Sequence, residues 1–398
     1  MWVRRRLDIQ WSDLAFGLWR CFSTDENRRA AIERAWSGDA SALACLSVRT
    51  GFDLCWQALE VPKGSEVLMS AINVPAMFRL VEEYGLIPVP LDIDAASLRP
   101  TVEDVRQAIT PRTRAIVVAH LFGTRVDLGD IAALARERGL VLIEDHAQAF
   151  SGVPDAASSS ADVALWSFGP IKAATALGGA IAVALDPQLM GRMRAIESTY
   201  PVQRRIRYAS RLLKYATLKA VSYRLPFGVL MGVLSWAGVD TDAWLNARVR
   251  SFDDTAPLSA LRRRPSGPLL ALLDRRLRTF DAAGVACRRR RGLALERMVE
   301  DHARVPGAAA AWRGFDLFPV CVADTARLVA ALRRYGFDAG TGRNLAVFGE
   351  EEGAGLVGAC RLLANAVFIP FYAAMPDREL RRLARALKDG LRKRTAVL

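Results

Sequence analysis

Two residues with complementary chemistry lie at the ends of neighbouring predicted strands. Lys172 follows a predicted strand at residues 163–168 and precedes another that opens with Gly178 and Gly179. Asp145 closes an earlier apolar run. A lysine amine can form a Schiff base with an aldehyde, and a carboxylate can keep a pyridine nitrogen protonated. This pair therefore predicts pyridoxal 5'-phosphate as the cofactor.

Alternating strand and helix patterns must position this pair. Strand-like runs are predicted at residues 66–69, 87–91, 115–119, 140–143, 163–168 and 180–183. Helical patterns lie between several of them, including residues 102–109 and 128–138. This alternation is typical of an α/β fold, in which a mostly parallel sheet is covered by helices on both faces. Ligands of such folds bind at the carboxyl ends of the strands, where Asp145 lies.

The 398 residues exceed what a single core usually holds, so two lobes are expected. The C-terminal part mixes predicted strands at residues 315–322 and 366–370 with helices at residues 325–335 and 378–392. We therefore predict an N-terminal arm at residues 1–30, a large α/β domain at residues 31–263 and a smaller α+β domain at residues 264–398.

The composition excludes several classes of protein. A net charge of +13 suits nucleic acid, an anionic membrane or a phosphorylated ligand, but no nucleic-acid module accompanies it, so nucleic-acid binding is not expected. The 6 cysteines lack C-x-x-C spacing and there are only 3 histidines, so neither a metal site nor a disulfide framework is expected. The sequence shows no secretion signal and no run long enough to span a bilayer, and a cytoplasmic location is expected.

Several stretches of the chain form a recognisable series, namely residues 64–67, 88–93, 108–115, 120–123, 143–148, 167–172, 368–370 and 377–380. This series resembles the motifs of the DegT/DnrJ/StrS family of pyridoxal phosphate-dependent aminotransferases, and it runs in family order from about residue 30 to the C-terminus. The family consists mostly of nucleotide-sugar aminotransferases with the aspartate aminotransferase fold, also called fold type I. The resemblance therefore implies fold type I and an aminotransferase activity.

The resemblance also implies roles for individual residues. Lys172 would hold the cofactor and move the proton, while Asp145 would pair with the pyridine nitrogen. Gln148 would lie next to the phenolic oxygen of the cofactor, and Ala147 would pack against its ring. Ser167 would bind the phosphate. The family's second phosphate-binding turn corresponds to the start of a predicted helix at residues 52–59, where Arg49 and Thr50 are the candidates.

The chain departs from the family pattern at three places. Val74 stands where an aromatic residue usually covers the cofactor ring, and residues 173–177 lack the usual asparagine and acid. Residues 262–266 keep the serine, but not the asparagine, of a loop that the family lends to a partner subunit. The basic run in this loop would offer charge to an acidic ligand. His120 and His146 are interpreted as packed, hydrogen-bonded residues rather than ligands, and the alternative for His146 is that it tunes Asp145 or contacts substrate.

Residues 199–252 form an insert that the family pattern does not require. Its basic residues Arg204, Arg207, Arg211 and Lys214 share one helical stripe, and Ile206, Leu213, Ala216 and Ala220 share another. An uncharged stretch, residues 225–239, is predicted as an apolar hairpin, with Trp236 and Trp244 near its end. Two interpretations stay open: helices packed on protein, or peripheral contact of residues 204–240 with the inner face of the membrane.

Three hypotheses for function follow from the sequence. The leading one is an aminotransferase that moves an amino group from L-glutamate to a nucleotide-linked keto-sugar, for polysaccharide or secondary-metabolite synthesis, and that works as a homodimer. The second keeps the cofactor but assigns a lipid-linked or hydrophobic keto acceptor at the membrane. The third is a regulatory or scaffold protein without turnover, favoured by Val74 and by residues 173–177.

Overall fold

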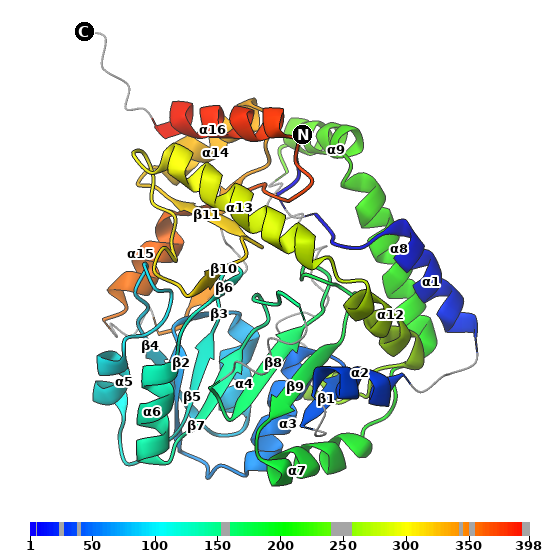
Figure 1. The fold of residues 1–398 in the computed structure, drawn as a ribbon, viewed down its shortest axis with the longest axis vertical. Coiled ribbons are helices and arrows are strands. Elements are labelled where there is room, and N and C mark those ends of the chain that lie inside the picture. Colours follow the sequence, from blue (N-terminus) through cyan, green and yellow to red (C-terminus); the bar gives the residue numbers. More distant parts are fainter. Residues whose placement is uncertain are drawn as a thin grey trace.

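The computed structural model describes residues 1–4, 6–23, 28–37, 41–152, 160–239, 257–341, 345–349 and 355–391. Its centre is a seven-stranded sheet in the order β1-β9-β8-β7-β5-β2-β4 (Figure 1). The strands are β1 (Ala42–Cys45), β2 (Glu66–Ser70), β4 (Ile87–Leu91), β5 (Thr113–Ala119), β7 (Val141–Asp145), β8 (Val163–Ser167) and β9 (Ala180–Ala184). All neighbours pair in parallel except β9, which is antiparallel to both β1 and β8. The predicted α/β fold with a mostly parallel sheet is confirmed.

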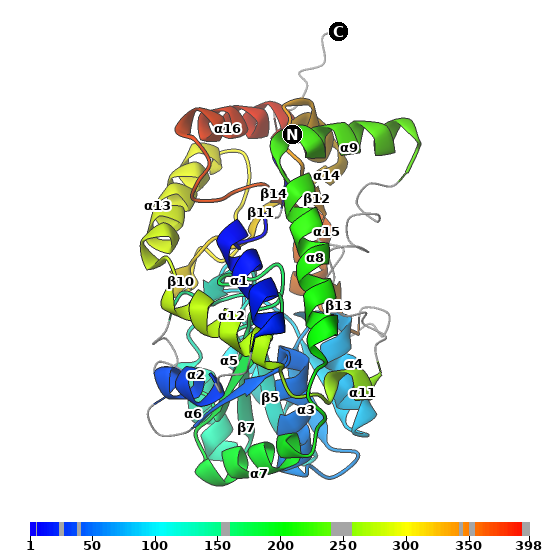
Figure 2. The same ribbon diagram turned by 90° about the vertical axis from the view of Figure 1, so that its right-hand side faces the viewer.

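Helices cover both faces of this sheet (Figures 1 and 2), which explains why its strands read as unbroken apolar runs. One face packs on α3 (Val48–Leu59), α4 (Pro75–Glu83) and α7 (Pro187–Ser198), near the short α11 (Leu258–Leu261). On the other face, α5 (Val102–Ala108) and α6 (Gly129–Arg138) pack near β2 and β5. The same face near β8 and β9 packs on α1 (Trp11–Phe22), α2 (Arg29–Trp36), α8 (Arg205–Val221) and α12 (Gly267–Arg278).

A smaller core lies at the other end of the molecule. There α13 (Ala282–Val299), α14 (Thr325–Arg334) and α16 (Asp377–Leu391) pack with the antiparallel sheet of β11 (Phe318–Cys321), β14 (Ala366–Ile369) and β12 (Gly340–Thr341). The leucines of α12 pack with the large-sheet core. The smaller core takes its residues from α13 onward and from Trp2 of the N-terminal arm, and the domain boundary at residue 264 stays a prediction. Two short antiparallel pairs join distant segments: β3 (Ile72–Asn73) with β13 (Ala346–Val347), and β6 (Thr124–Arg125) with β10 (Trp312–Arg313). The helix α15 (Val357–Asn365) packs near β13 and the large-sheet core.

The described part of the predicted insert, residues 199–239, contains two helices, α8 and α9 (Arg224–Trp236). The helix α8 packs on α1 and α12 through Tyr208, Leu212 and Tyr215, whereas Ile206 and Leu213 of the predicted apolar stripe are 70% and 57% exposed. The predicted hairpin is wrong for the described residues, because residues 225–236 continue as one helix. Trp244 lies outside the described residues. None of the helices described in the structure is long and apolar enough to cross a membrane.

Candidate active site

The sheet brings the ends of β7 and β8 together at one edge. Asp145 is the last residue of β7 and Ser167 the last residue of β8, and these two strands pair in parallel with Asp145 opposite Leu165. Lys172 lies on the loop that connects β8 to the antiparallel β9. A return strand beside β8 forces this loop to stay at the carboxyl edge, which is why Lys172 lies within electrostatic reach of Asp145.

A pocket opens at this edge and collects most of the predicted site. Its described lining comprises Val74, Ala147, Gln148, Phe150, Ser167, Ile171, Lys172, Ala173, Asp316, Leu317 and Leu345. Five predicted residues are therefore brought together, namely Val74, Ala147, Gln148, Ser167 and Lys172. Val74 is the small residue that precedes α4, and Phe150 is the aromatic residue of the described lining.

Asp145 is a buried carboxyl group held by hydrogen bonds. Its Oδ1 accepts the backbone N–H of Ala147 at 2.9 Å, and the side chain of Asn73 also bonds to it. Burial raises the pKa of Asp145, while the Ala147 N–H and the positive charge of Lys172 oppose that rise. A ligand with a protonated ring nitrogen would supply the cationic partner that this buried acid needs to ionise. The residues present therefore fit a pyridine cofactor.

Gln148 is oriented by the neighbouring loop. Its Oε1 accepts the backbone N–H of Phe122 at 3.1 Å, which leaves the amide NH₂ as the donor end of the side chain. Gln148 also lines the pocket. This orientation suits a residue that donates to an oxygen of a bound ring.

The predicted phosphate residues divide into two groups. Ser167 lines the pocket, whereas Arg49 and Thr50 do not appear in its described lining. Thr50 is committed elsewhere, because its hydroxyl donates to the carbonyl of Leu261 at 2.9 Å and its N–H donates to the Ser47 hydroxyl that caps α3. The start of α3 nevertheless lies at the same sheet edge as Ser167, because β1 and β8 both run antiparallel to β9. It offers the positive end of a helix dipole there.

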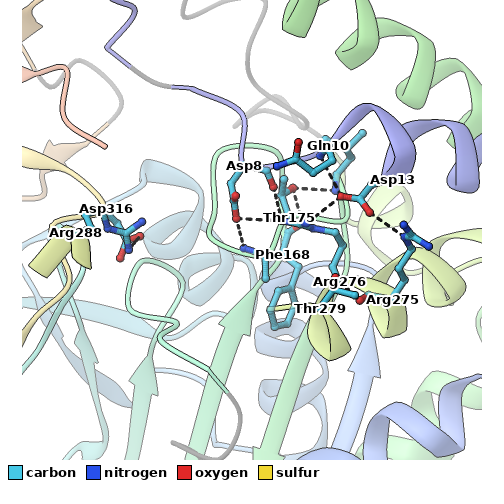
Figure 3. A network of polar contacts seen from close by, with 12 residues as sticks. Asp8, Gln10, Asp13, Phe168, Thr175, Arg275, Arg276, Thr279, Arg288 and Asp316 are labelled. Atoms are coloured by element: carbon cyan, nitrogen blue, oxygen red, sulfur yellow. Dashed lines mark hydrogen bonds and ion pairs between the residues drawn. The ribbon is translucent and has the colours of Figure 1, made fainter. Parts of the chain in front are cut away.

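The lysine loop is anchored by the N-terminal arm, which sequence reasoning did not connect to the site (Figure 3). The Asp8 carboxylate accepts the N–H of Ala174 at 2.8 Å, and Arg276 of α12 donates to Asp8 at 3.1 Å. Within the loop, Thr175 donates its hydroxyl to the carbonyl of Phe168. Asp8 therefore supplies an acid to a loop whose own residues 173–177 contain none. No local pattern could have signalled a contact across 166 positions.

Asp316 is a second residue that sequence reasoning missed. It lines the pocket, and Arg288 of α13 donates to its Oδ1, while no donor among the described residues reaches its buried Oδ2. Burial raises the pKa of Asp316, and the charges of Arg288 and Lys172 oppose that rise. Gly123 makes room for it, because a Cβ there would lie 2.6 Å from Oδ2. Asp316 thus presents an acceptor to the pocket that contains Lys172.

The loop at residues 262–266 is bound within its own chain. Arg262 pairs with the buried Asp53 at 3.1 Å, and Arg264 donates to the Tyr200 carbonyl at 3.0 Å. The Ser266 hydroxyl donates to Gln203 at 3.1 Å. The expectation that this basic run offers its charge to an acidic ligand is therefore corrected for Arg262 and Arg264, because both guanidinium groups already bond inside the protein.

Both histidines of the region are packed behind Asp145. His120 and His146 stack with ring centroids 4.0 Å apart, and their Nε2 atoms lie 3.3 and 2.6 Å from the same Glu144 oxygen. His120 Nδ1 accepts the Val126 N–H, so its Nε2 carries the proton and donates to Glu144. These three side chains could also surround a cation. The Nε2 atoms of both histidines bond to Glu144, whereas the buried Nδ1 of His146 has no partner among the described residues.

Acid should destabilise the protein through His146. Burial lowers the pKa of His146 from 6.5 to about 4, so the unfolded chain binds a proton in this range that the folded chain does not. The stabilisation is complete above pH 6.5 and is lost as the pH falls toward 4. Between pH 7 and pH 5 the wild type should lose about 2 kcal/mol more unfolding free energy than His146→Gln, measured with urea. An equal loss in the variant would contradict this assignment.

Comparison with known sequences gives one family and several relatives. Residues 29–224 match the sequence model of the DegT/DnrJ/EryC1/StrS aminotransferase family. A UDP-N-acetyl-3-dehydro-alpha-D-glucosamine 3-aminotransferase of Acidithiobacillus ferrooxidans is 34% identical over 165 residues, covering 41% of this chain and 45% of that protein. A dTDP-4-dehydro-2,3,6-trideoxy-D-glucose 4-aminotransferase of Saccharopolyspora spinosa is 35% identical over 142 residues, covering 35% and 37%. The match thus spans less than half the length of either relative.

Solved structures share the whole fold. The aminotransferase TlmJ from Streptoalloteichus hindustanus superimposes with a TM-score of 0.73 at 22% identity, covering 98% of this chain and 99% of that one. The PMP form of a putative sugar aminotransferase, Spr1654 from Streptococcus pneumoniae, gives 0.72 at 15% identity, covering 97% and 98%. These likenesses confirm the predicted fold type I.

Proposed function

We propose that the chain is a pyridoxal phosphate-dependent aminotransferase of the DegT/DnrJ/EryC1/StrS family, whose sequence model matches residues 29–224. The observation that carries this proposal is that Lys172, which lines the pocket at the carboxyl edge of the sheet, lies within electrostatic reach of the buried Asp145. Neither side chain belongs to the hydrophobic core. A lysine close to a buried acid is typical of a functional site, and packing alone does not require it.

Pyridoxal phosphate, when bound, supplies an aldehyde that condenses with amines and a ring that accepts the electrons of a broken Cα–H bond. The protein's residues would divide the remaining work. The Lys172 amine, held on its anchored loop, takes and returns the proton at the substrate carbon. Asp145 keeps its negative charge against the ring nitrogen, and the Gln148 amide donates to an oxygen of the ring. The Ser167 hydroxyl, with the positive end of α3 at the same edge, binds phosphate.

We propose L-glutamate as the amino donor and a nucleotide-linked keto-sugar as the acceptor. The two curated relatives act on UDP- and dTDP-linked dehydro-sugars, as their names state, which supports a sugar acceptor. The unpartnered Oδ2 of Asp316 is an acceptor in the pocket, and it suits a sugar hydroxyl or the ammonium group of a donor. A homodimer and a cytoplasmic location, with peripheral contact at the inner face of the membrane, complete this proposal.

Amino transfer can be tested in two half-reactions. L-glutamate added to the protein reconstituted with pyridoxal phosphate should change the visible absorption of the cofactor and release 2-oxoglutarate. A UDP- or dTDP-linked keto-sugar should then reverse the change. Absorption that does not respond to amino donors would instead support a scaffold protein. A response to glutamate that only a lipid-linked ketone reverses would redirect the proposal to the second acceptor class. Light scattering measures whether the protein is a dimer.

A further inference from the structure

The helix α9 exposes an apolar stripe along its whole length. Leu225, Val229, Val233 and Trp236 are 83%, 67%, 55% and 91% exposed. Their spacings of four, four and three residues place them on one face of the helix. Large apolar side chains at this exposure normally occur singly on a protein surface, so a row of four needs an explanation. We call these four residues the α9 stripe.

The opposite face of α9 is fastened to the protein. Phe227, Met231 and Leu234 are 2%, 6% and 9% exposed and lie about half a helical turn away from the stripe. The amino group of Met1 donates to the carbonyl of Arg224 at 2.9 Å. The stripe is therefore held outward by a helix whose other side is buried.

A basic helix lies next to α9 at the same end of the molecule, as both views show (Figures 1 and 2). The two helices are linked through Trp2, whose ring lies 4.3 Å from the Arg224 guanidinium and whose N–H donates to Glu379 of α16 at 2.9 Å. Arg378, Arg381 and Arg385 of α16 are exposed and share one face. This end of the molecule therefore combines uncharged apolar side chains with a row of positive charges.

The nearby acidic residues cancel only part of this charge, because five basic residues of α16 stand against three acidic ones. Asp377 pairs with Arg291 of α13, and Asp389 accepts the hydroxyl of Tyr335 and keeps its own charge. Glu379 is buried, bonds to Trp2 and Arg382, and lies 3.8 Å from Arg378. The arginine row on α16 thus faces solvent and contributes to the protein's net charge of +13.

We propose that this end of the molecule docks on an anionic lipid bilayer, with the α9 stripe among the acyl chains at the interface and the arginines of α16 against lipid phosphates. Interfacial helices bind through such a combination of apolar side chains and flanking positive charge, and tryptophan favours the headgroup level. A second copy of the chain fits less well, because it would cover the stripe but add a second arginine row instead of an anionic partner for the first. The docking does not depend on the proposed transamination.

Vesicle flotation of the full chain tests the apolar contribution. The wild type should float with vesicles of phosphatidylcholine and phosphatidylglycerol in equal parts, and much less with phosphatidylcholine alone. Val229→Asp combined with Val233→Asp should weaken binding by about tenfold or more, because charged side chains are costly at the interface. Val357→Asp on α15, a valine that is 60% exposed, is the matched control and should bind as the wild type.

A second pair of variants tests the charge. Arg381→Glu with Arg385→Glu should weaken binding to the anionic vesicles several-fold, and added salt should weaken the wild type similarly. Arg136→Glu with Arg138→Glu on α6, away from α9, makes the same charge change and should have little effect.

Three results would overturn the docking proposal. The first is a wild type that fails to float with either vesicle. The second is a Val229→Asp, Val233→Asp variant that floats as well as the wild type. The third is a wild type that is a dimer by light scattering and does not bind vesicles, together with a Val229→Asp, Val233→Asp variant that is a monomer. That result would assign the stripe to a second copy of the chain. The cofactor absorption of each variant checks that it is folded, and it reports separately on the proposed enzyme site.

Discussion

Replacing Lys172 with alanine is expected to slow amino transfer from L-glutamate by at least about a thousandfold, because the variant loses the amine that we propose moves the proton at the substrate carbon. The residue lies on a loop that Asp8 anchors through Ala174, and its charge acts on Asp145. The measurement is the rate at which the visible absorption of the reconstituted protein changes after L-glutamate is added.

The Lys172→Ala test has a matched control in the same chain. Lys63 is an exposed lysine that precedes β2, and Lys63→Ala should react at the wild-type rate. An external amine such as methylamine should restore part of the rate in Lys172→Ala, because it supplies the missing base without its positioning. Wild-type kinetics in Lys172→Ala would remove the lysine from the mechanism and favour the scaffold hypothesis.

Asp145→Asn is expected to slow the same step by about a hundredfold or more and to weaken cofactor binding, because a neutral amide cannot balance a protonated ring nitrogen. The substitution preserves the shape of the side chain, so the hydrogen bond from the Ala147 N–H can persist. Because burial raises the pKa of Asp145, activity of the wild type should also fall as the pH is lowered toward that pKa. The rate with L-glutamate and the cofactor dissociation constant are both measured.

The control for this variant is Asp130→Asn on α6, which removes a partly exposed carboxylate that pairs with Arg99 at 2.8 Å. It should leave both quantities unchanged, since a partly exposed ion pair on a helix contributes little. An Asp145→Asn variant with full activity and unchanged affinity would mean that the ring nitrogen does not depend on this carboxylate.

The elements around the site were predictable because their patterns are local. β7 and β8 are short apolar runs that end in a polar residue, and such runs identify buried parallel strands without any knowledge of their neighbours. β1 was missed, because Ala42–Cys45 contains no β-branched or aromatic residue. The prediction of a helix at α8 is confirmed, but the sequence pattern did not identify the buried face of that helix. Tyr208 and Tyr215 pack inward, whereas Ile206 and Leu213 face solvent.

The sequence by itself determined the α/β class, and it placed Lys172, Asp145, Gln148 and Ser167 at or just after the ends of strands whose carboxyl ends must meet at one sheet edge. Only the tertiary structure decided which distant residues complete that site. Asp8 and Asp316 reach it from the N-terminal arm and the smaller lobe, and Thr50 turns to the Leu261 carbonyl instead. Only the fold, likewise, sets α9 beside α16. The periodicity of apolar residues indicates which face of a single helix or strand is buried. Contacts between residues hundreds of positions apart depend on how those helices and strands pack together.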